Sequence, residues 1–214
     1  MTWLAKLKTE NVMRILGSVF LAIYFLVSTR TAMANASAEF RAGRMAKDSK
    51  TRKAYFQKGM DEARSILKLQ GDSAEGLFWL AVNMGAEALE RGKMSALPIV
   101  PQMERLLLKL DGIDPKYEDA GASRVLGRLY HQAPSVISVG SSEKAKYFLE
   151  RALKFAPGHP GNQAFAADFL LEKGQDERAK KLAAACLKSL DASGGKYGDE
   201  AREWRELAQD VVDD

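Results

Sequence analysis

Apolar residues recur every three or four positions through most of the chain after residue 37, which is the spacing of amphipathic α-helices. Long runs of β-branched residues are absent and only six of the 214 residues are proline, which also favours helices. Glycine and proline clusters mark the breaks between the apolar stretches. The pattern predicts an all-α chain with helices near 38–48, 51–69, 73–91, 95–110, 117–132, 142–155, 161–173, 176–190 and 198–212.

The clearest internal repeat lies between residues 117 and 157. Leu126, Gly127 and Tyr130 stand on its first helix, and its second helix carries Ala145, Leu149, Ala152 and then Pro157, spaced by 4, 3 and 5. These spacings match a tetratricopeptide helix pair. Small residues at Gly127 and Ala145 let the two helices approach closely, and Pro157 ends the unit because it cannot continue a helix.

Two further units keep the same register. Ala179, Ala183 and Cys186 repeat the spacing of 4 and 3, and Leu80 with Ala81 marks an earlier first helix. The best repeats are therefore 73–115, 117–157 and 161–191, and the helix at 198–212 caps the last pair. We expect a single domain over 37–214, a tetratricopeptide-like array of helical hairpins with a C-terminal capping helix.

The repeat at 117–157 contains six residues more than the standard unit, inserted in the loop at 132–141. Insertions in loops cost little free energy, but this loop carries Val136, Ile137 and Val139. Because exposed apolar residues that cluster usually pack against something, the loop is a candidate surface for self-association, and we expect a homo-oligomer.

The first 36 residues have the layout of a secretory signal peptide. Lys6, Lys8 and Arg14 precede an uncharged stretch over 15–29, and small residues follow with spacings that predict cleavage after Ala34 or Ala36. Fifteen uncharged residues are fewer than the ~20 of a membrane-spanning helix, although a retained anchor is the alternative. No cysteine stands at the cleavage point, so we expect a periplasmic protein that is not a lipoprotein.

The formal net charge of +4 comes largely from this segment, since residues 37–214 hold 28 basic and 27 acidic residues. Charge therefore gives no reason to expect nucleic-acid binding. A basic cluster does remain after the segment, and it is either a solvated helix face or a contact for an acidic partner or anionic lipid. Its members are Arg41, Arg44, Lys47, Lys50, Arg52, Lys53 and Lys58.

Several stretches resemble one family of helical-repeat proteins. These are 76–85, then 104–117, then the first helix of the best repeat with its insertion, and finally 144–153. Together they are similar to the T component of TPR-associated TRAP transporters over about residues 60–185. The resemblance implies a periplasmic helical protein that pairs with an extracytoplasmic substrate-binding protein and assembles into small oligomers.

Residue types that carry catalysis are scarce. The chain has two histidines and one cysteine, with no metal-ligand spacing, nucleophile elbow, phosphate loop or dinucleotide fingerprint. We expect no cofactor, no metal and no enzymatic activity. Cys186 falls on an apolar helix face and is predicted to be buried, whereas His159, between glycine and proline, is predicted at the surface.

In a curved array, the first helix of each pair is expected to line the concave side. Arg124, Arg128 and His131 then form one stripe at i, i+4 and i+7. The stripe has Phe78 and Val82 on the preceding first helix and Asp168 on the following one. Two arginines one turn apart could hold the carboxylate of a small organic anion, or they could pair with nearby acids instead.

These features favour a binding protein over an enzyme. The first hypothesis is an adaptor of a solute-uptake system that contacts a substrate-binding protein. The alternative is a scaffolding protein of the cell envelope that binds a peptide or another envelope protein in the same groove.

Overall fold

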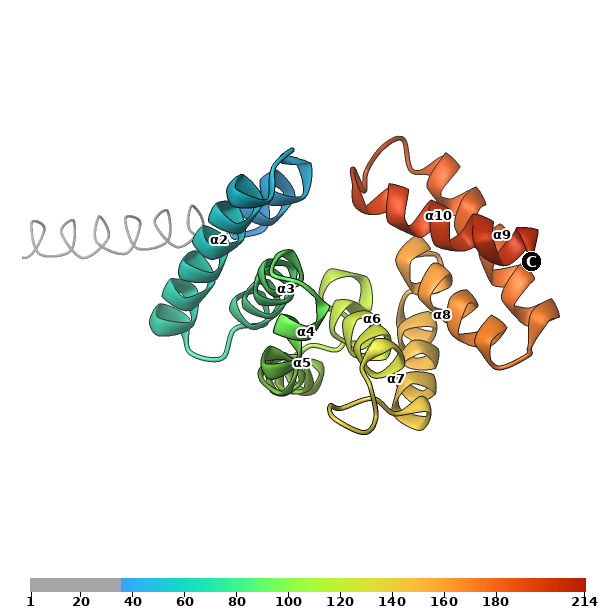
Figure 1. Cartoon of the computed structure of the whole chain (residues 1–214), viewed down its shortest axis with the longest axis horizontal. Helices are drawn as coiled ribbons and strands as arrows, with labels where there is room; N and C mark the ends of the chain where they lie inside the picture. Colours follow the sequence, from blue (N-terminus) through green and yellow to red (C-terminus); the bar gives the residue numbers. More distant parts are fainter. Residues whose placement is uncertain (1–35) are drawn as a thin grey trace, which may run out of the picture.

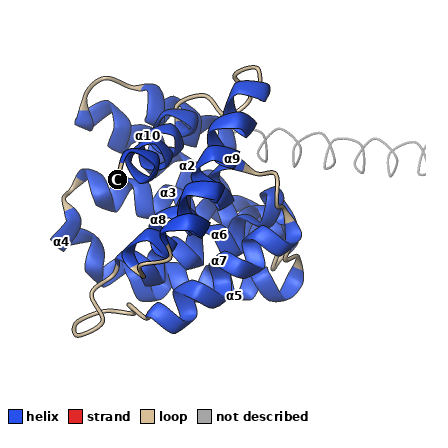
Figure 2. Ribbon diagram, turned by 90° about the vertical axis from the view of Figure 1, so that its right-hand side faces the viewer, coloured by secondary structure: helices blue, strands red, loops and turns tan. Residues whose placement is uncertain are grey.

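The computed structural model describes residues 36–214, and every regular element in that range is a helix (Figure 2). The first described helix covers 36–45, and the signal peptide predicted at 1–36 lies outside the described residues except for Ala36. The other elements follow in order: α2 (Ser49–Gln70), α3 (Ala74–Glu90), α4 (Lys93–Ala96), the 3₁₀ turn η1 (Leu97–Ile99), α5 (Val100–Ile113), α6 (Tyr117–Gln132), α7 (Ser142–Phe155), α8 (Pro160–Glu172), α9 (Asp176–Ala192) and α10 (Glu200–Asp213).

Two predicted helices differ clearly from the structure, and both differences have local causes. The helix predicted at 95–110 is divided, because Pro98 opens η1 and Pro101 opens α5, and proline fits only the first turn of a helix. The helix predicted at 38–48 ends at Met45. Asp48 instead begins α2, since its carboxylate accepts a hydrogen bond of 2.9 Å from the amide of Thr51.

Helices α6 and α7 pack as the repeat at 117–157 predicts. Leu126 and Ala145 are fully buried between them. Gly127 lies so close to Leu149 that a Cβ at this position would stand 2.7 Å from the leucine side chain. The ring of Tyr130 stacks on Phe148 with centroids 5.6 Å apart. Small residues therefore bring the two helices together, and large ones fill the space beside them.

The C-terminal helix closes the last pair, because α10 packs against both α8 and α9. Trp204 is buried there, with its ring 5.3 Å from Tyr197 and 5.1 Å from His159. Cys186 is fully buried beneath the same helix, which confirms the prediction that this thiol is buried.

The prediction of a surface position for His159 was wrong. His159 is the N-cap of α8, its Nδ1 accepts a hydrogen bond from the amide of Gly161, and only 7% of the residue is exposed. Burial, with the charges of Arg124 and Lys196, lowers the pKa of His159 to about 3. The sequence places His159 in a turn, but α10 covers that turn.

The described helices form a curved array (Figure 1). Helices α3, α6 and α8 lie on the inner side of the curve, whereas α5, α7 and α9 lie on the outer side. The opening of the curve lies between the first described helices and α10. Across it, Nη2 of Arg44 stands 3.0 Å from Oε2 of Glu203. The N-terminal and C-terminal ends of the array are thus joined by an ion pair.

Candidate partner-binding face

Three residues of the predicted stripe come together between α6 and α8. Arg128 forms an ion pair with Asp168, and its guanidinium also lies 4.8 Å from the ring centroid of Phe165. His131 reaches the same group, with Nδ1 3.7 Å from Oδ2 of Asp168 and Nε2 2.7 Å from Oε2 of Glu172. The inner face at these helices therefore presents a polar network in which the charge of Arg128 is balanced by Asp168.

Arg124 lies apart from that network and is only 7% exposed. Its Nη1 donates to the carbonyl oxygens of Glu118 at 3.1 Å and Asp119 at 3.2 Å, and to Oδ1 of Asn162 at 3.3 Å. No carboxylate of the described residues lies within 4 Å of this guanidinium. Burial lowers the pKa of Arg124. The negative charges of nearby acids, of which Glu200 has the largest effect, act to raise it.

The carbonyls that Arg124 binds are exposed by an unusual turn at the start of α6. Glu118, Asp119 and Ala120 have φ angles of 49°, 54° and 64°, which is the left-handed region that residues with a Cβ rarely adopt. In this turn the carbonyl oxygens of Glu118 and Asp119 accept hydrogen bonds from side chains. Asn162 also donates to the carbonyl of Asp119, at 3.2 Å. Arg124 and Asn162 together hold the turn against α8.

The two apolar members of the predicted site differ in position. Phe78 is 4% exposed and packs edge-on against Trp79 at 5.0 Å and Tyr117 at 5.7 Å. Gly121 of α6 lies against its ring. Phe78 is therefore part of the core between α3 and α6. Val82, one turn further along α3, is only partly buried.

Three carboxylates that the sequence did not indicate as site residues lie in the first turns of α3, α6 and α10. Glu75 begins α3, Glu118 begins α6 and Glu200 begins α10. Burial raises the pKa of Glu75 and of Glu200, and the charge of Glu118 acts in the same direction on both. The sequence signal that could have indicated them is an acid in the first turn of each predicted helix, where the helix dipole favours a negative charge.

The inserted loop projects on the side away from the opening (Figure 1). Val136 is 92% and Ile137 64% exposed, whereas Val139 packs against the core. The loop is held at its base, where the amide of Ser141 donates to the carbonyl of Tyr130 at 3.0 Å. Gly140 passes so close to Ala133 that a Cβ there would meet its carbonyl oxygen at 1.9 Å. The two exposed side chains are thus presented by an anchored loop.

Within residues 36–214, no group of three or more histidine, cysteine, aspartate or glutamate side chains could hold a metal ion. No helix in the same range combines the length and the apolar character needed to cross a membrane.

Comparisons with known proteins agree with this architecture. A thermophilic tetratricopeptide-repeat protein of Thermus thermophilus superposes with a TM-score of 0.52 at 14% identity, over 90% of this chain and 96% of the other. At that identity the likeness concerns the fold alone. The search of curated proteins found no match. The model of the TRAP transporter T-component family matches residues 31–193, about three quarters of the sequence, so the chain belongs to that family.

Proposed function

We propose that this protein is a non-catalytic adaptor of a TRAP-type solute-uptake system, and that it acts by binding the system's substrate-binding protein. The observation that carries the proposal is the family match over residues 31–193. The tetratricopeptide-like array supports it, because stacked helix pairs form extended concave surfaces suited to binding another protein. We propose a periplasmic location, since the N-terminal sequence has the layout of an export signal.

We assign the contact to the inner face of α6 and α8. Arg128 and Asp168 already pair with one another there, and the Arg128 side chain is 17% and the Asp168 side chain 32% exposed. A free organic anion would have to displace Asp168 to bind Arg128. A protein surface with both signs of charge can instead add contacts around the existing pair. We therefore favour a protein partner over a small organic anion on this face.

The test is mild crosslinking in cells followed by purification of the full chain. Recovery of the extracytoplasmic substrate-binding protein encoded beside a TRAP permease is the expected result. The charge-swapped variant Arg128→Asp/Asp168→Arg keeps an ion pair between α6 and α8 but reverses the charges on the inner face. It should recover at least about tenfold less partner, because specificity at such surfaces depends on complementary charge.

A matched swap on a different surface is Arg205→Asp/Asp191→Arg, which exchanges the exposed pair between α10 and α9. This control should recover the partner like the unmodified protein. Recovery of no substrate-binding protein by the unmodified chain would contradict the proposed function. Equal recovery by both swaps would instead move the contact away from α6 and α8.

A further inference from the structure

The positive charge of the folded chain is concentrated at its N-terminal end. Residues 41–58 hold seven basic residues and one acidic residue, whereas residues 59–214 hold 21 basic and 25 acidic residues. Charge is therefore unevenly distributed along the sequence, and the excess of basic residues lies in less than a tenth of the chain.

Ion pairs account for only three of these seven cations. Arg44 pairs with Glu203, Arg52 with Glu90 and Lys58 with Glu39. The other four form no ion pair with any residue in 36–214. We call these four the basic tip: Arg41, Lys47, Lys50 and Lys53.

Three of the four members of the basic tip, Lys47, Lys50 and Lys53, lie at the beginning of α2, where cations are unfavourable for folding. The N-terminus of a helix carries partial positive charge, and α2 has no acidic residue in its first turn. Helices α5 and α8 also lack acids there, whereas α3, α6, α7, α9 and α10 have them.

The acids beside the basic tip already have partners. Asp48 accepts a hydrogen bond from the amide of Thr51. Glu90 pairs with Arg52, which lowers the pKa of Glu90, and Lys53 acts in the same direction. The cations therefore add to the field of the helix end, and helix stability does not explain them.

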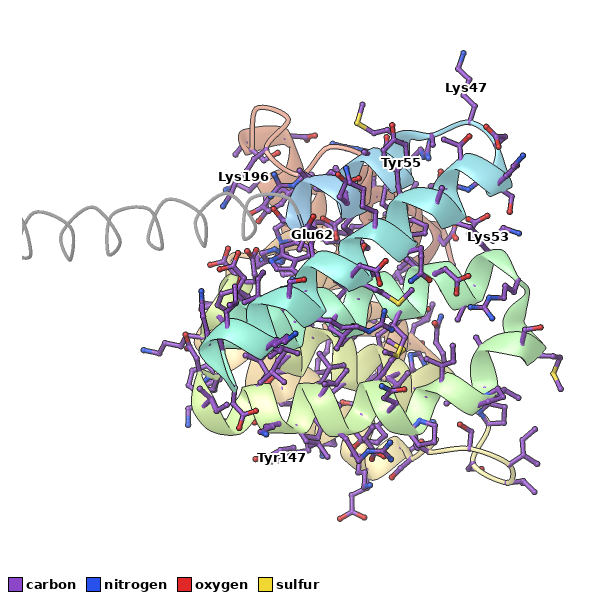
Figure 3. All side chains as sticks on the ribbon, turned by 90° about the vertical axis from the view of Figure 1, so that its left-hand side faces the viewer. Lys47, Lys53, Tyr55, Glu62, Tyr147 and Lys196 are labelled. Carbon is purple, nitrogen blue, oxygen red and sulfur yellow. The ribbon has the colours of Figure 1, made fainter. Side chains whose placement is uncertain are left out.

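Apolar side chains accompany the cations. Met45 is 72% exposed and lies one turn from Arg41 on the same helix, at i and i+4. Tyr55 is also exposed. Figure 3 shows Lys47 projecting beyond the end of α2, with Lys53 and Tyr55 on the first turns of that helix.

We propose that the basic tip binds the surface of a membrane that contains anionic lipid headgroups. Three of its four cations are lysines, whose flexible point charges suit a diffuse anionic surface, whereas planar arginine is preferred for bidentate contacts with carboxylates of a protein. The tip occupies the projecting end of a helix (Figure 3). The exposed Met45, one turn from Arg41, adds an apolar side chain that can enter the headgroup region.

Vesicle sedimentation with the full chain tests this proposal. One set of vesicles contains phosphatidylglycerol and phosphatidylcholine in a ratio of about one to three, and the other contains phosphatidylcholine alone. Any binding by the apolar stretch at 15–29 is common to both sets, so the difference between them measures the electrostatic part. We expect at least about tenfold tighter binding to the anionic vesicles, and we expect 0.5 M salt to remove this difference, since Debye screening acts over about 10 Å or less.

The decisive variant is Lys47→Glu/Lys50→Glu/Lys53→Glu. It should bind anionic vesicles at least about tenfold more weakly, because each lysine near such a surface contributes several-fold in affinity, and its binding to neutral vesicles should not change. It should also fold, because none of the three side chains is buried and glutamate is favourable at position 50 in the first turn of α2; circular dichroism checks this.

The control Lys180→Glu/Lys181→Glu/Lys188→Glu changes the net charge equally on α9 and should keep the binding to anionic vesicles within about threefold. Equal binding of the unmodified protein to both vesicle types would overturn the proposal. Equal loss by the two triple variants would overturn it as well, because net charge would then explain the binding. Loss of an acidic protein partner with unchanged vesicle binding would show that the tip contacts protein and not lipid.

Discussion

Arg124 illustrates what single residues contribute to this molecule. Its place on the inner stripe of α6 follows from helical spacing, but its burial does not. The left-handed turn that it holds is formed by Glu118, Asp119 and Ala120, residues that a sequence pattern assigns to an ordinary helix. The sequence thus selects the residue and misses the backbone that defines its contacts.

Replacing Arg124 by alanine should lower the free energy of unfolding by roughly 2–4 kcal/mol, since the carbonyls of the left-handed turn would lose their buried donor. Chemical denaturation measures the change. Arg105→Ala, at an exposed position on α5, should change stability by less than about 0.5 kcal/mol. If Arg124→Ala has the same free energy of unfolding as the unmodified chain but binds the partner more weakly, the role of Arg124 is to contact the partner and not to stabilise the turn.

His159 should make stability depend on pH. Its pKa of about 3 in the folded state lies below the usual value of 6.5, so the unfolded chain binds the extra proton between these values. Stability that is present above pH 6.5 should decline as the pH falls towards 3, by about 1.4 kcal/mol per pH unit from this group at most. The raised pKa values of Glu75 and Glu200 act in the opposite direction, which makes comparison with a variant necessary.

That variant is His159→Asn, because asparagine keeps an acceptor for the helix N-terminus and does not titrate. Denaturation midpoints measured from pH 8 to pH 4 should fall less steeply for His159→Asn than for the unmodified protein. Parallel curves would mean that His159 does not carry this pH dependence.

At the scale of elements, the sequence predicts a helix boundary well when residues next to that boundary determine it, and poorly when contacts distant in sequence do. The bounds of α6 and α7 match the prediction, because Pro134, Gly140 and Pro157 mark the ends of their helical patterns clearly. The division at α4, η1 and α5 was missed, although Pro98 and Pro101 were visible, because the apolar spacing continues through them. The packing of α10 over His159 involves positions distant in sequence, which periodicity does not report.

The contact between α6 and α7 depends on the absence of a side chain at Gly127. Gly127→Ala should destabilise the protein by about 1–3 kcal/mol, because its Cβ would meet Leu149 at 2.7 Å and the backbone amide of Leu149 at 3.1 Å. Gly112→Ala in α5 is the control. A Cβ added at Gly112 would meet no atom within 4 Å apart from its chain neighbours and its own helix backbone, and alanine there should stabilise the helix by roughly 0.5–1 kcal/mol. Thermal unfolding distinguishes the two, and equal shifts would contradict the close packing.

The inserted loop offers a test of self-association. Val136→Ser/Ile137→Ser should convert an oligomer to smaller species in native mass spectrometry without lowering the unfolding temperature, because both side chains are exposed. Met45→Ser, at another exposed apolar position, should leave the oligomer intact. An unchanged oligomer in the loop variant would show that these residues do not form the contact.

For the whole molecule, the curvature of the array sets how far its two ends lie apart. Each helix packs mainly against its neighbours, as in other repeat arrays, so small changes at successive contacts add up along the curve. The pair Arg44–Glu203 connects the ends directly, across 159 residues of sequence. Its side chains are 32% and 45% exposed, and such pairs contribute at most about 1 kcal/mol. This ion pair is therefore weak enough that a partner binding to the inner face can break it.

Arg44→Ala should widen the distribution of distances between the ends while leaving helicity unchanged. Spin labels at Ala54→Cys on α2 and Arg202→Cys on α10, both exposed positions, report the distance by double electron–electron resonance. The natural Cys186 should stay unlabelled at neutral pH, since it is fully buried and burial raises its pKa to about 11. The matched control Arg64→Ala removes a surface pair within α2 and should not affect the distribution. Identical distributions for Arg44→Ala and the control would mean that packing along the array, and not this ion pair, keeps the ends together.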